Sequence, residues 1–281
     1  MRIKIWGCRG SLPTPGASTL RYGGNTTCLE VRTADNRLFV IDAGSGLRRL
    51  GQAIHADGGT LEFCLMLTHS HWDHLMGFPF FTPGYFSKYR IRICGGPGAQ
   101  QSLRTSLGHQ MEPPYFPVDL RAMKADFCFD CHAPGEQCHP TVGVHAVPLS
   151  HPNGGYGYEF VEDGKRFLFL TDNELGLQHE GGLTRDEYVE VCKGVDILLH
   201  DAQYTDEEYE QRTRGWGHST YREAVDLAIE AGVKRLGLFH HDPDRRDEDL
   251  DRILEWCQEH VLAQGSDLDC FVAAEGKELE I

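Results

Sequence analysis

The sequence lacks three features that would place the protein at a membrane, on nucleic acid or outside the cell. No apolar run approaches ~18 residues, the length that a membrane-spanning helix needs. Residues 1–6 predict a strand and lack the apolar core and cleavage site of a signal peptide. Positive charge is scarce, because 27 lysines and arginines face 42 aspartates and glutamates, giving a net charge of −15. We therefore expect a cytoplasmic protein with no membrane partner.

The shortage of positive charge also limits which phosphate compounds the protein binds. Tight binding to a nucleic-acid backbone depends on lysines and arginines that displace counterions from many phosphates. The sequence contains no basic arm rich in glycine or proline that would supply such contacts. We expect no extended nucleic-acid footprint, whereas a small phosphate ester held by metal ions remains compatible with this composition.

Paired cysteine motifs are almost absent, although the chain has ten cysteines. Several of them lie inside predicted strands, and without an export signal the expected state is a reduced, buried thiol. The one exception is Cys128, Cys131 and Cys138, followed by His139, where Cys-x-x-Cys spacing is typical of structural zinc sites. No second Cys-x-x-Cys follows, so we expect simple packing here, with a structural zinc as the alternative.

The pattern of apolar residues predicts one α+β domain that spans residues 1–281. Strands are expected over residues 3–6, 28–32, 38–42, 61–67, 90–94, 125–130, 142–149, 156–162, 166–170, 196–200, 235–239 and 268–273. Helices are expected over 99–108, 221–231 and 248–261, with Ser219 or Thr220 as the cap of the second. This alternation favours two packed sheets with helices outside. The irregular segment 111–139 is expected to form a lid or wall of the site.

The most informative segment comes directly after the apolar strand 61–67. It contains three histidines and one aspartate, in the order His69, His71, Asp73 and His74. Imidazole nitrogens and carboxylate oxygens are the ligands that borderline and hard divalent metals prefer. Alternate residues at a strand end share one side, so His69 and His71 are expected to point together, and the next two residues to face a second ion.

Three further polar residues occupy the same kind of place, at the end of an apolar strand. His151 follows residues 147–150, Asp172 follows 167–171, and His240 follows 235–239. A carboxylate such as that of Asp172 can bridge two cations with its two oxygens. His240 and His241 are adjacent and compete, since neighbouring residues on a strand point to opposite faces.

Together these residues resemble the metal motif of the metallo-β-lactamase-fold hydrolases, and more specifically that of the ribonuclease Z and phosphodiesterase branch. The likeness runs nearly end to end and includes residues 7–11, 23–27 and 42–44. It implies a four-layer αβ/βα sandwich. It also implies that one metal is held by His69, His71 and His151, and another by Asp73, His74 and His240, with Asp172 between them.

Two other segments resemble motifs of the phosphodiesterase branch. Residues 200–203 resemble its His-Glu-Ala-Thr motif, and 217–220 resemble its His-Ser-Thr motif. The resemblance implies that His218 is a general acid and that Asp201 orients it, and it adds Asp73 to the catalytic set. Protonation of a departing alkoxide lowers its barrier, and a carboxylate on the other ring nitrogen holds the tautomer. Aspartate replaces the usual glutamate, which leaves a shorter side chain to reach His218.

The predicted function is hydrolysis of a small or cyclic nucleotide phosphodiester by water that two divalent ions activate. Zinc is the first expectation, with manganese or iron as alternatives. Only 20 residues separate His151 from Asp172, so there is no room between them for the basic arm of ribonuclease Z. The alternatives are an RNA 3′-processing endonuclease, a thioester, lactone or β-lactam hydrolase, and a non-catalytic metal-bearing binding module. Trp216 is a candidate pocket residue by its position before residues 217–218, whereas for Phe81, Tyr85, Tyr115 and Phe116 we expect simple packing, with a base-stacking pocket as the alternative.

Overall fold

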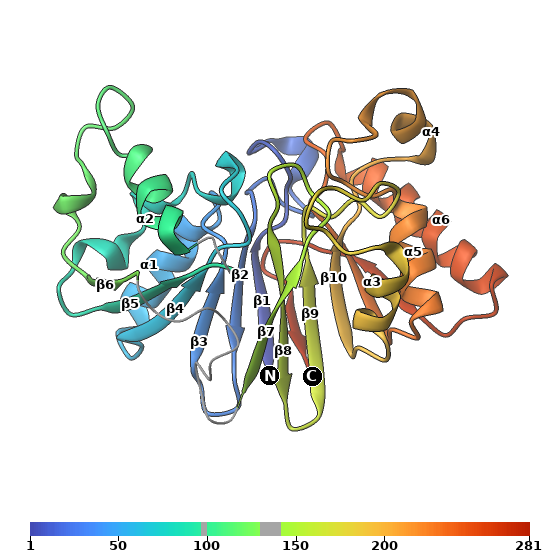
Figure 1. The fold of residues 1–281 in the computed structure, drawn as a ribbon, viewed down its shortest axis with the longest axis horizontal. Coiled ribbons are helices and arrows are strands. Elements are labelled where there is room, and N and C mark those ends of the chain that lie inside the picture. Colours follow the sequence, from blue (N-terminus) through green and yellow to red (C-terminus); the bar gives the residue numbers. More distant parts are fainter. Residues whose placement is uncertain (97–99, 130–141) are drawn as a thin grey trace.

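The structure, a computed structural model, describes residues 1–96, 100–129 and 142–281. Two mixed β-sheets face each other, and helices cover the outer face of each sheet (Figure 1). The first sheet has the order β13-β1-β2-β3-β4-β5-β6, and the second has the order β12-β11-β10-β9-β8-β7. Helices α1 and α2 lie outside the first sheet, and α3, α5 and α6 lie outside the second. The predicted four-layer αβ/βα sandwich is thereby confirmed.

The helices and strands have the following bounds. The strands of the first sheet are β1 (Arg2–Gly7), β2 (Cys28–Arg32), β3 (Leu38–Ile41), β4 (Glu62–Met66), β5 (Arg90–Cys94), β6 (Asp126–Cys128) and β13 (Glu278–Glu280). Those of the second are β7 (Gly143–Pro148), β8 (Tyr156–Glu162), β9 (Lys165–Leu170), β10 (Ile197–Asp201), β11 (Arg235–Phe239) and β12 (Asp269–Val272). The α-helices are α1 (Leu47–Asp57), α2 (Gln100–His109), α3 (Arg185–Cys192), α4 (Asp206–Glu208), α5 (Tyr221–Glu230) and α6 (Asp247–Ala263).

Each sheet contains a block of parallel strands, and this arrangement brings strand ends together. Strands β3 to β6 run parallel in the first sheet, and β9 to β12 run parallel in the second. Parallel neighbours end at the same edge of a sheet, so polar residues that follow several of these strands meet at one place. Within the described residues, no helix is long and apolar enough to cross a bilayer.

Three apolar cores hold the layers together. The central core lies between the sheets, where the rings of Phe39 and Phe160 meet edge to face with centroids 5.3 Å apart. A second core joins the first sheet to α1, and includes Leu47 and Val40. A third joins the second sheet to α3, α5 and α6. Burial on both faces explains why the central strands are almost wholly apolar in sequence.

Most predicted strands are present, and the elements that sequence analysis missed have physical reasons. Helix α1 contains a glycine, Gly51, and has no side-chain cap at its start. Helix α3 has eight residues, yet Thr184 and Glu187 form a capping box that marks its start. Strand β13 has three residues and is recognisable only by its pairing with β1. Thr220, rather than Ser219, caps α5.

The cysteine predictions are confirmed only for the described part of the chain. None of the eight described cysteines forms a disulfide, and seven of them are buried. Burial raises the pKa of Cys192 to about 12, which keeps this thiol protonated and unreactive. Cys131, Cys138 and His139 lie outside the described residues, so the alternative of a structural zinc there stays a prediction.

Candidate metal centre and active site

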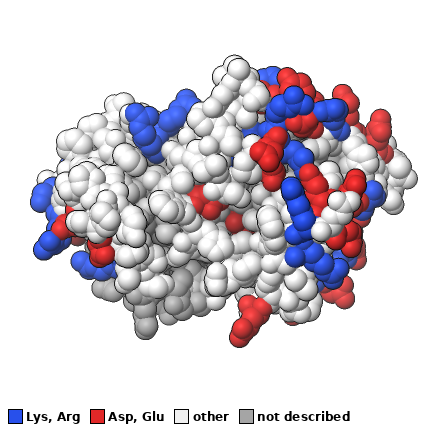
Figure 2. All heavy atoms as spheres, turned by 90° about the horizontal axis from the view of Figure 1, so that it is seen from above, with Lys and Arg blue, Asp and Glu red and all other residues white. Residues whose placement is uncertain are grey.

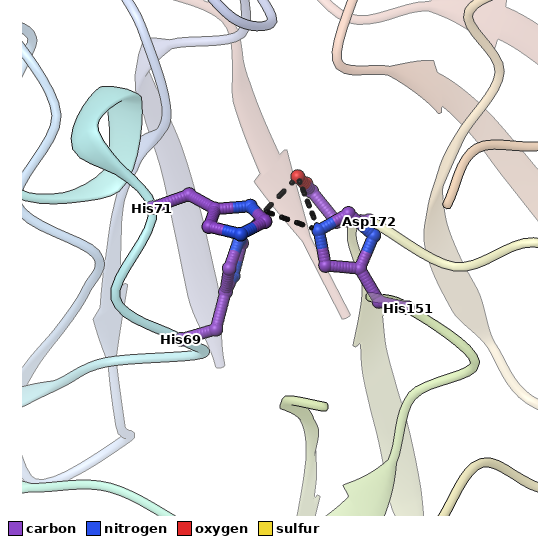
Figure 3. A group of neighbouring side chains, drawn as sticks. All are labelled: His69, His71, His151 and Asp172. Atoms are coloured by element: carbon purple, nitrogen blue, oxygen red, sulfur yellow. Dashed lines mark hydrogen bonds and ion pairs between the residues drawn. The ribbon is translucent and has the colours of Figure 1, made fainter. Parts of the chain in front are cut away.

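Three overlapping groups of imidazole and carboxylate side chains meet where strands of both sheets end, and the third, formed by Asp201, His218 and His240, contains the predicted acid. The first group combines His69 and His71 after β4, His151 after β7, and Asp172 after β9 (Figure 3). One nitrogen or oxygen from each of these four residues lies within 4.8 Å of the others. The side chains point toward one another from both sheets, and all except the half-buried His71 are buried.

The second group shares one carboxylate with the first. It consists of Asp73, His74, Asp172 and His240, all buried and again with one ligand atom each within 4.8 Å of the others. Asp73 and His74 lie in a short 3₁₀ turn directly after the first group's histidines. The structure therefore brings together all seven residues that the sequence singled out as metal ligands, in the two sets expected. We call these seven the metal-type residues and the two sets the metal-type groups.

Asp172 faces both groups, with one oxygen toward each. Its Oδ2 lies 3.5 Å from His69 Nε2 and 3.7 Å from His151 Nε2. Its Oδ1 lies 3.3 Å from His74 Nε2 and 3.2 Å from His240 Nε2. Asp172 has φ +58°, a left-handed conformation that aspartate tolerates better than most residues but at a cost. The fold thus holds this carboxylate in a strained backbone position from which it reaches both groups.

Partners on the far side of the rings orient four of the five histidines. In each of these four rings Nδ1 contacts a protein oxygen, which leaves Nε2 for the site. The pairs are His69 with Thr68 Oγ1 at 3.0 Å, His74 with Asp42 Oδ2 at 2.8 Å, His151 with the Gly217 carbonyl at 2.9 Å, and His240 with Gln203 Oε1 at 3.1 Å. His71 differs, since its Nδ1 lies 3.0 Å from His151 Nε2. This arrangement is typical of histidines that bind metal.

The unsatisfied atoms and charges of the site fit divalent cations. His69 Nε2 and His74 Nε2 are buried, and neither has a hydrogen-bond partner among the described residues. Although burial alone raises the pKa of Asp172, the imidazoles of His240, His74 and His69 hold it well below its usual value. Burial alone lowers the pKa of His74, yet Asp172 and two other aspartates raise it well above the usual range. The buried carboxylates therefore favour positive charge at this site, and bound cations would provide it.

The competition between the two adjacent histidines has a geometric answer. His240 Nε2 lies 3.1 Å from Asp73 Oδ2, within the second group. His241 points the other way, where its Nε2 lies 2.9 Å from the carbonyl of Ala273. Burial lowers the pKa of His241 to about 3, so it remains a neutral ring in the core. Only His240 is placed to hold a metal.

The predicted acid, His218, contacts its predicted partner, Asp201. His218 Nδ1 lies 3.0 Å from Asp201 Oδ2, so the shorter aspartate does reach the ring. Burial lowers the pKa of His218 and raises that of Asp201, because it disfavours the charged form of each group. The rings of His218 and His240 stack with centroids 5.0 Å apart. His218 Nε2 has no hydrogen-bond partner among the described residues and is free to meet a substrate oxygen.

A buried carboxylate, that of Glu174, anchors the loop that leads to the predicted acid, His218. Its Oε1 accepts hydrogen bonds from the Tyr209 hydroxyl at 2.6 Å and the Gly215 amide at 2.7 Å. Its Oε2 accepts one from the Gly217 amide at 2.8 Å and lies 2.7 Å from His179 Nε2. Although burial alone raises the pKa of Glu174, these hydrogen bonds hold it below its ordinary value of 4.5.

The same loop also touches the first metal group, through Gly217. A Cβ atom at this position would lie 1.9 Å from His151 Nδ1, and its φ of +92° is left-handed. Only glycine fits, because the loop must pass directly against the ring that its carbonyl orients. Glu174 therefore fixes one loop that contacts the metal-type residue His151 and also carries the predicted acid, His218.

We expect Glu174→Gln to lower turnover roughly tenfold and the free energy of unfolding by about 2 kcal/mol, because buried hydrogen bonds to a charged carboxylate are lost. Kinetic assays and urea unfolding measure these effects. The depressed pKa means that the carboxylate's stabilisation is present above its ordinary pKa of 4.5 and is lost as pH falls further. In Glu174→Gln the free energy of unfolding should therefore lack the part that wild type loses as the pH falls below 4.5. Glu190→Gln, on the exposed surface of α3, is the matched control and should change neither quantity.

Sequence analysis assigned no role to several residues that complete the site. Asp42 accepts hydrogen bonds from the amide and hydroxyl of Thr68, both at 2.8 Å, and also contacts His74. It follows an apolar strand, as the predicted ligands do, so the same signal was available. Gln203 and Glu174 lie in loops, where only the tertiary structure reveals what they contact.

Comparisons with known proteins agree with this geometry. Residues 37–241 match the family model described as "Beta-lactamase superfamily domain". The chain is 27% identical over 327 residues to the ribonuclease Z of Haloferax volcanii, covering 100% of this chain and 95% of the relative. It superposes on yeast PDE1 with a TM-score of 0.70 at 17% identity, covering 100% of this chain and 99% of that one. A diphosphatase of the PhnP family gives 0.68 at 18% identity, covering 100% and 97%.

The family match spans most of the chain and includes all seven metal-type residues, four that follow a strand of the first sheet and three that follow strands of the second. The low identities to the solved structures establish the fold alone, whereas the family model establishes membership. The chain therefore belongs to the beta-lactamase superfamily, with the metallo-β-lactamase fold and with ribonuclease Z among the proteins that it resembles in sequence.

Proposed function

We propose that the protein is a phosphodiesterase that hydrolyses a small phosphodiester, of the size of a cyclic nucleotide. The observation that carries this proposal is the buried pair of His218 and Asp201 beside two metal-type groups. Hydrolysis of an alkyl phosphodiester releases a poor leaving group, which needs a proton donor. The competing substrates, above all a thioester that releases a thiolate, need less help from an acid for the leaving group. The ribonuclease Z relatives support the same class of reaction.

The residues that would hold the metals follow from the two groups. His69, His71 and His151 would hold one divalent ion, Asp73, His74 and His240 a second, and Asp172 would contact both. We propose zinc, because imidazole and carboxylate ligands in such numbers suit it. When bound, such ions make water nucleophilic near neutral pH and neutralise charge on a phosphoryl group.

The protein's own side chains would do the rest of the chemistry. His218 Nε2 would donate a proton to the departing oxygen, and Asp201 would hold the ring by its Nδ1–H. Gln203 and Asp42, which contact the far side of His240 and His74, would keep those rings from rotating. Burial of the metal-type groups would exclude bulk water from all but the open side.

The surface around the site supports a small substrate. A cleft of about 540 Å³ opens beside His69 and His71, and none of the described residues that line it is a lysine or an arginine. Figure 2 shows acidic atoms at the floor of a central hollow, while lysines and arginines lie to either side of it, those on the right intermixed with aspartates and glutamates. A long nucleic acid would meet few positive charges there. RNA 3′-end processing remains the second candidate, because the ribonuclease Z of Haloferax volcanii aligns over the whole chain.

A side-by-side assay of zinc-loaded protein tests the proposal. We expect turnover of bis(p-nitrophenyl) phosphate and of 2′,3′-cyclic AMP, and no turnover of nitrocefin. Treatment with a chelator should abolish activity, and added zinc should restore it. Exclusive turnover of nitrocefin would refute the proposal, and so would the absence of turnover of every ester under substrate excess. Faster cleavage of a precursor transfer RNA than of the small esters would favour the second candidate.

A further inference from the structure

A second cleft adjoins the one beside the metal-type residues. It has a volume of about 410 Å³, and we call it the Trp72 cleft. It is lined by Ser70, Trp72, Leu75, Ser106, His109, Gln110 and Tyr115. Ser70 also lines the cleft of the metal-type residues, so the two spaces share a wall. A ligand bound over the metal-type groups therefore has the Trp72 cleft as its nearest extension on this side.

Two large aromatic rings are exposed in the Trp72 cleft. Trp72 lies between His71 and Asp73 in the metal motif itself, and 68% of its surface is exposed. Its indole makes no hydrogen bond or ring contact with another described residue. Tyr115 is 67% exposed on the same cleft. Exposed apolar rings forgo the stabilisation that burial gives, so two such rings beside a reactive site point to a flat ligand that covers them.

A buried polar atom in the same cleft also lacks a partner. Gln110 Nε2 is shielded from solvent and has no hydrogen-bond partner among the residues that the structure describes. Buried amides are nearly always hydrogen-bonded, and a ligand in the cleft reaches this nitrogen only when the Gln110 side chain turns outward, which would give the amide the hydrogen bond that it lacks. An amide offers a donor and an acceptor side by side, which is the complement of a nucleobase edge. The cleft thus combines ring-stacking surface with a hydrogen-bond donor that has no partner in the protein.

The charge of the cleft indicates which part of a substrate it accepts. Among the described residues that line it there is no lysine, arginine, aspartate or glutamate, and the ionisable side chains are those of His109 and Tyr115. It is therefore unsuited to a phosphate and suited to an uncharged ring. Base-to-aromatic stacking tolerates every base, because each base presents a π-face.

We propose that the Trp72 cleft binds the nucleobase of a phosphodiester whose phosphate lies over the metal-type groups, with Trp72 as the stacking surface and Gln110 as the hydrogen-bond donor. This inference rests on the proposed function for the position of the phosphate. It makes Trp72 and Gln110 specificity residues, because they touch the base and not the scissile bond. The same base could belong to a small nucleotide or to the unpaired end of an RNA.

Direct binding tests the inference without relying on turnover. AMP and ribose 5-phosphate share a phosphate and a ribose and differ by the base, so the ratio of their dissociation constants reports the base alone. Calorimetry on the zinc-loaded protein should show AMP binding at least tenfold more tightly. Trp72→Ala should reduce this ratio by roughly 5- to 150-fold, to a minimum near 1, as expected for a lost stacking contact of ~1–3 kcal/mol. Trp72→Phe should keep most of it.

Controls separate a specific effect from damage to the fold. Phe86→Ala removes an exposed ring outside the cleft and should leave the ratio unchanged. Gln110→Ala gives a second variant, and it should lower the affinity for AMP but not for ribose 5-phosphate. Zinc content, measured for every variant, reports whether the metal-type groups remain assembled.

The possible outcomes distinguish the inference from the proposed function. Equal affinities for AMP and ribose 5-phosphate in the wild type would overturn the inference, and so would an AMP advantage that survives Trp72→Ala. A Trp72-dependent advantage without hydrolysis of any ester would keep the inference and refute the proposed function. A ten-residue adenylate RNA identifies the source of the base. Affinity like that of AMP indicates a small nucleotide, and much tighter, salt-sensitive binding indicates an RNA end.

Discussion

Replacement of His218 by alanine should lower the turnover of 2′,3′-cyclic AMP by roughly 10²–10⁴ while metal content stays intact. The ester's leaving group is a sugar alkoxide, which departs slowly unless a proton reaches it. His218 Nε2 is the candidate donor, because its Nδ1 is engaged by Asp201 at 3.0 Å and Nε2 has no partner among the described residues. Steady-state kinetics and metal analysis on the same samples measure the two quantities.

The leaving group provides a sharper readout than the size of the loss. p-Nitrophenolate departs without a proton, so the same variant should lose far less activity toward bis(p-nitrophenyl) phosphate. Asp201→Asn should show the same selective pattern at smaller size, because the ring remains but loses its orienting carboxylate. His145→Ala, an exposed residue on β7, is the matched control. Equal losses with both esters would mean that His218 positions the site and does not donate the proton.

The metal-type residues were predictable because their signal is local. Each follows an apolar strand, and strands that run in the same direction end at a common edge. Strands β9 and β11 belong to one parallel block, and β7 runs in the same direction as β9 because both pair antiparallel with β8, so His151, Asp172 and His240 lie at one edge of the second sheet. The packing of the two sheets then brings them to the residues after β4. The same logic applied to Asp42, which follows β3 and contacts His74, although no role was assigned to it. The order of the strands and the chemistry of the residues that follow them therefore account for the position of the metal-type residues.

The supporting residues were not predictable in the same way. Glu174 contacts three residues that are 35, 41 and 43 positions away in the chain, and no local pattern links them. Trp72 appears in the sequence as an apolar residue inside a polar motif, and only the structure shows that its ring is exposed on a cleft. Side-chain direction in loops depends on tertiary contacts, whereas strand ends fix it by the alternation of the chain.

Replacement of Asp172 by asparagine should abolish activity, with a loss of roughly 10³-fold or more. Residues that merely support metal ligands cost ~10–100-fold when changed, and Asp172 is placed to contact both metals directly. Asparagine is close in size to aspartate and tolerates the left-handed backbone at φ +58°, so the change removes the charge and keeps the conformation. One amide oxygen can still face one group, but the amide nitrogen cannot ligate a cation.

Metal analysis should therefore show a smaller loss of metal than of activity, with at least one ion per chain missing. Unlike chelator-treated wild type, Asp172→Asn should not recover activity when zinc is added back, since the bridging charge is absent. Asp267→Asn, on an exposed loop, serves as the matched control and should retain full metal content. Full metal content and normal turnover in Asp172→Asn would show that the two groups act independently. The carboxylate that lies 3.2 to 3.7 Å from four imidazoles would then be structural.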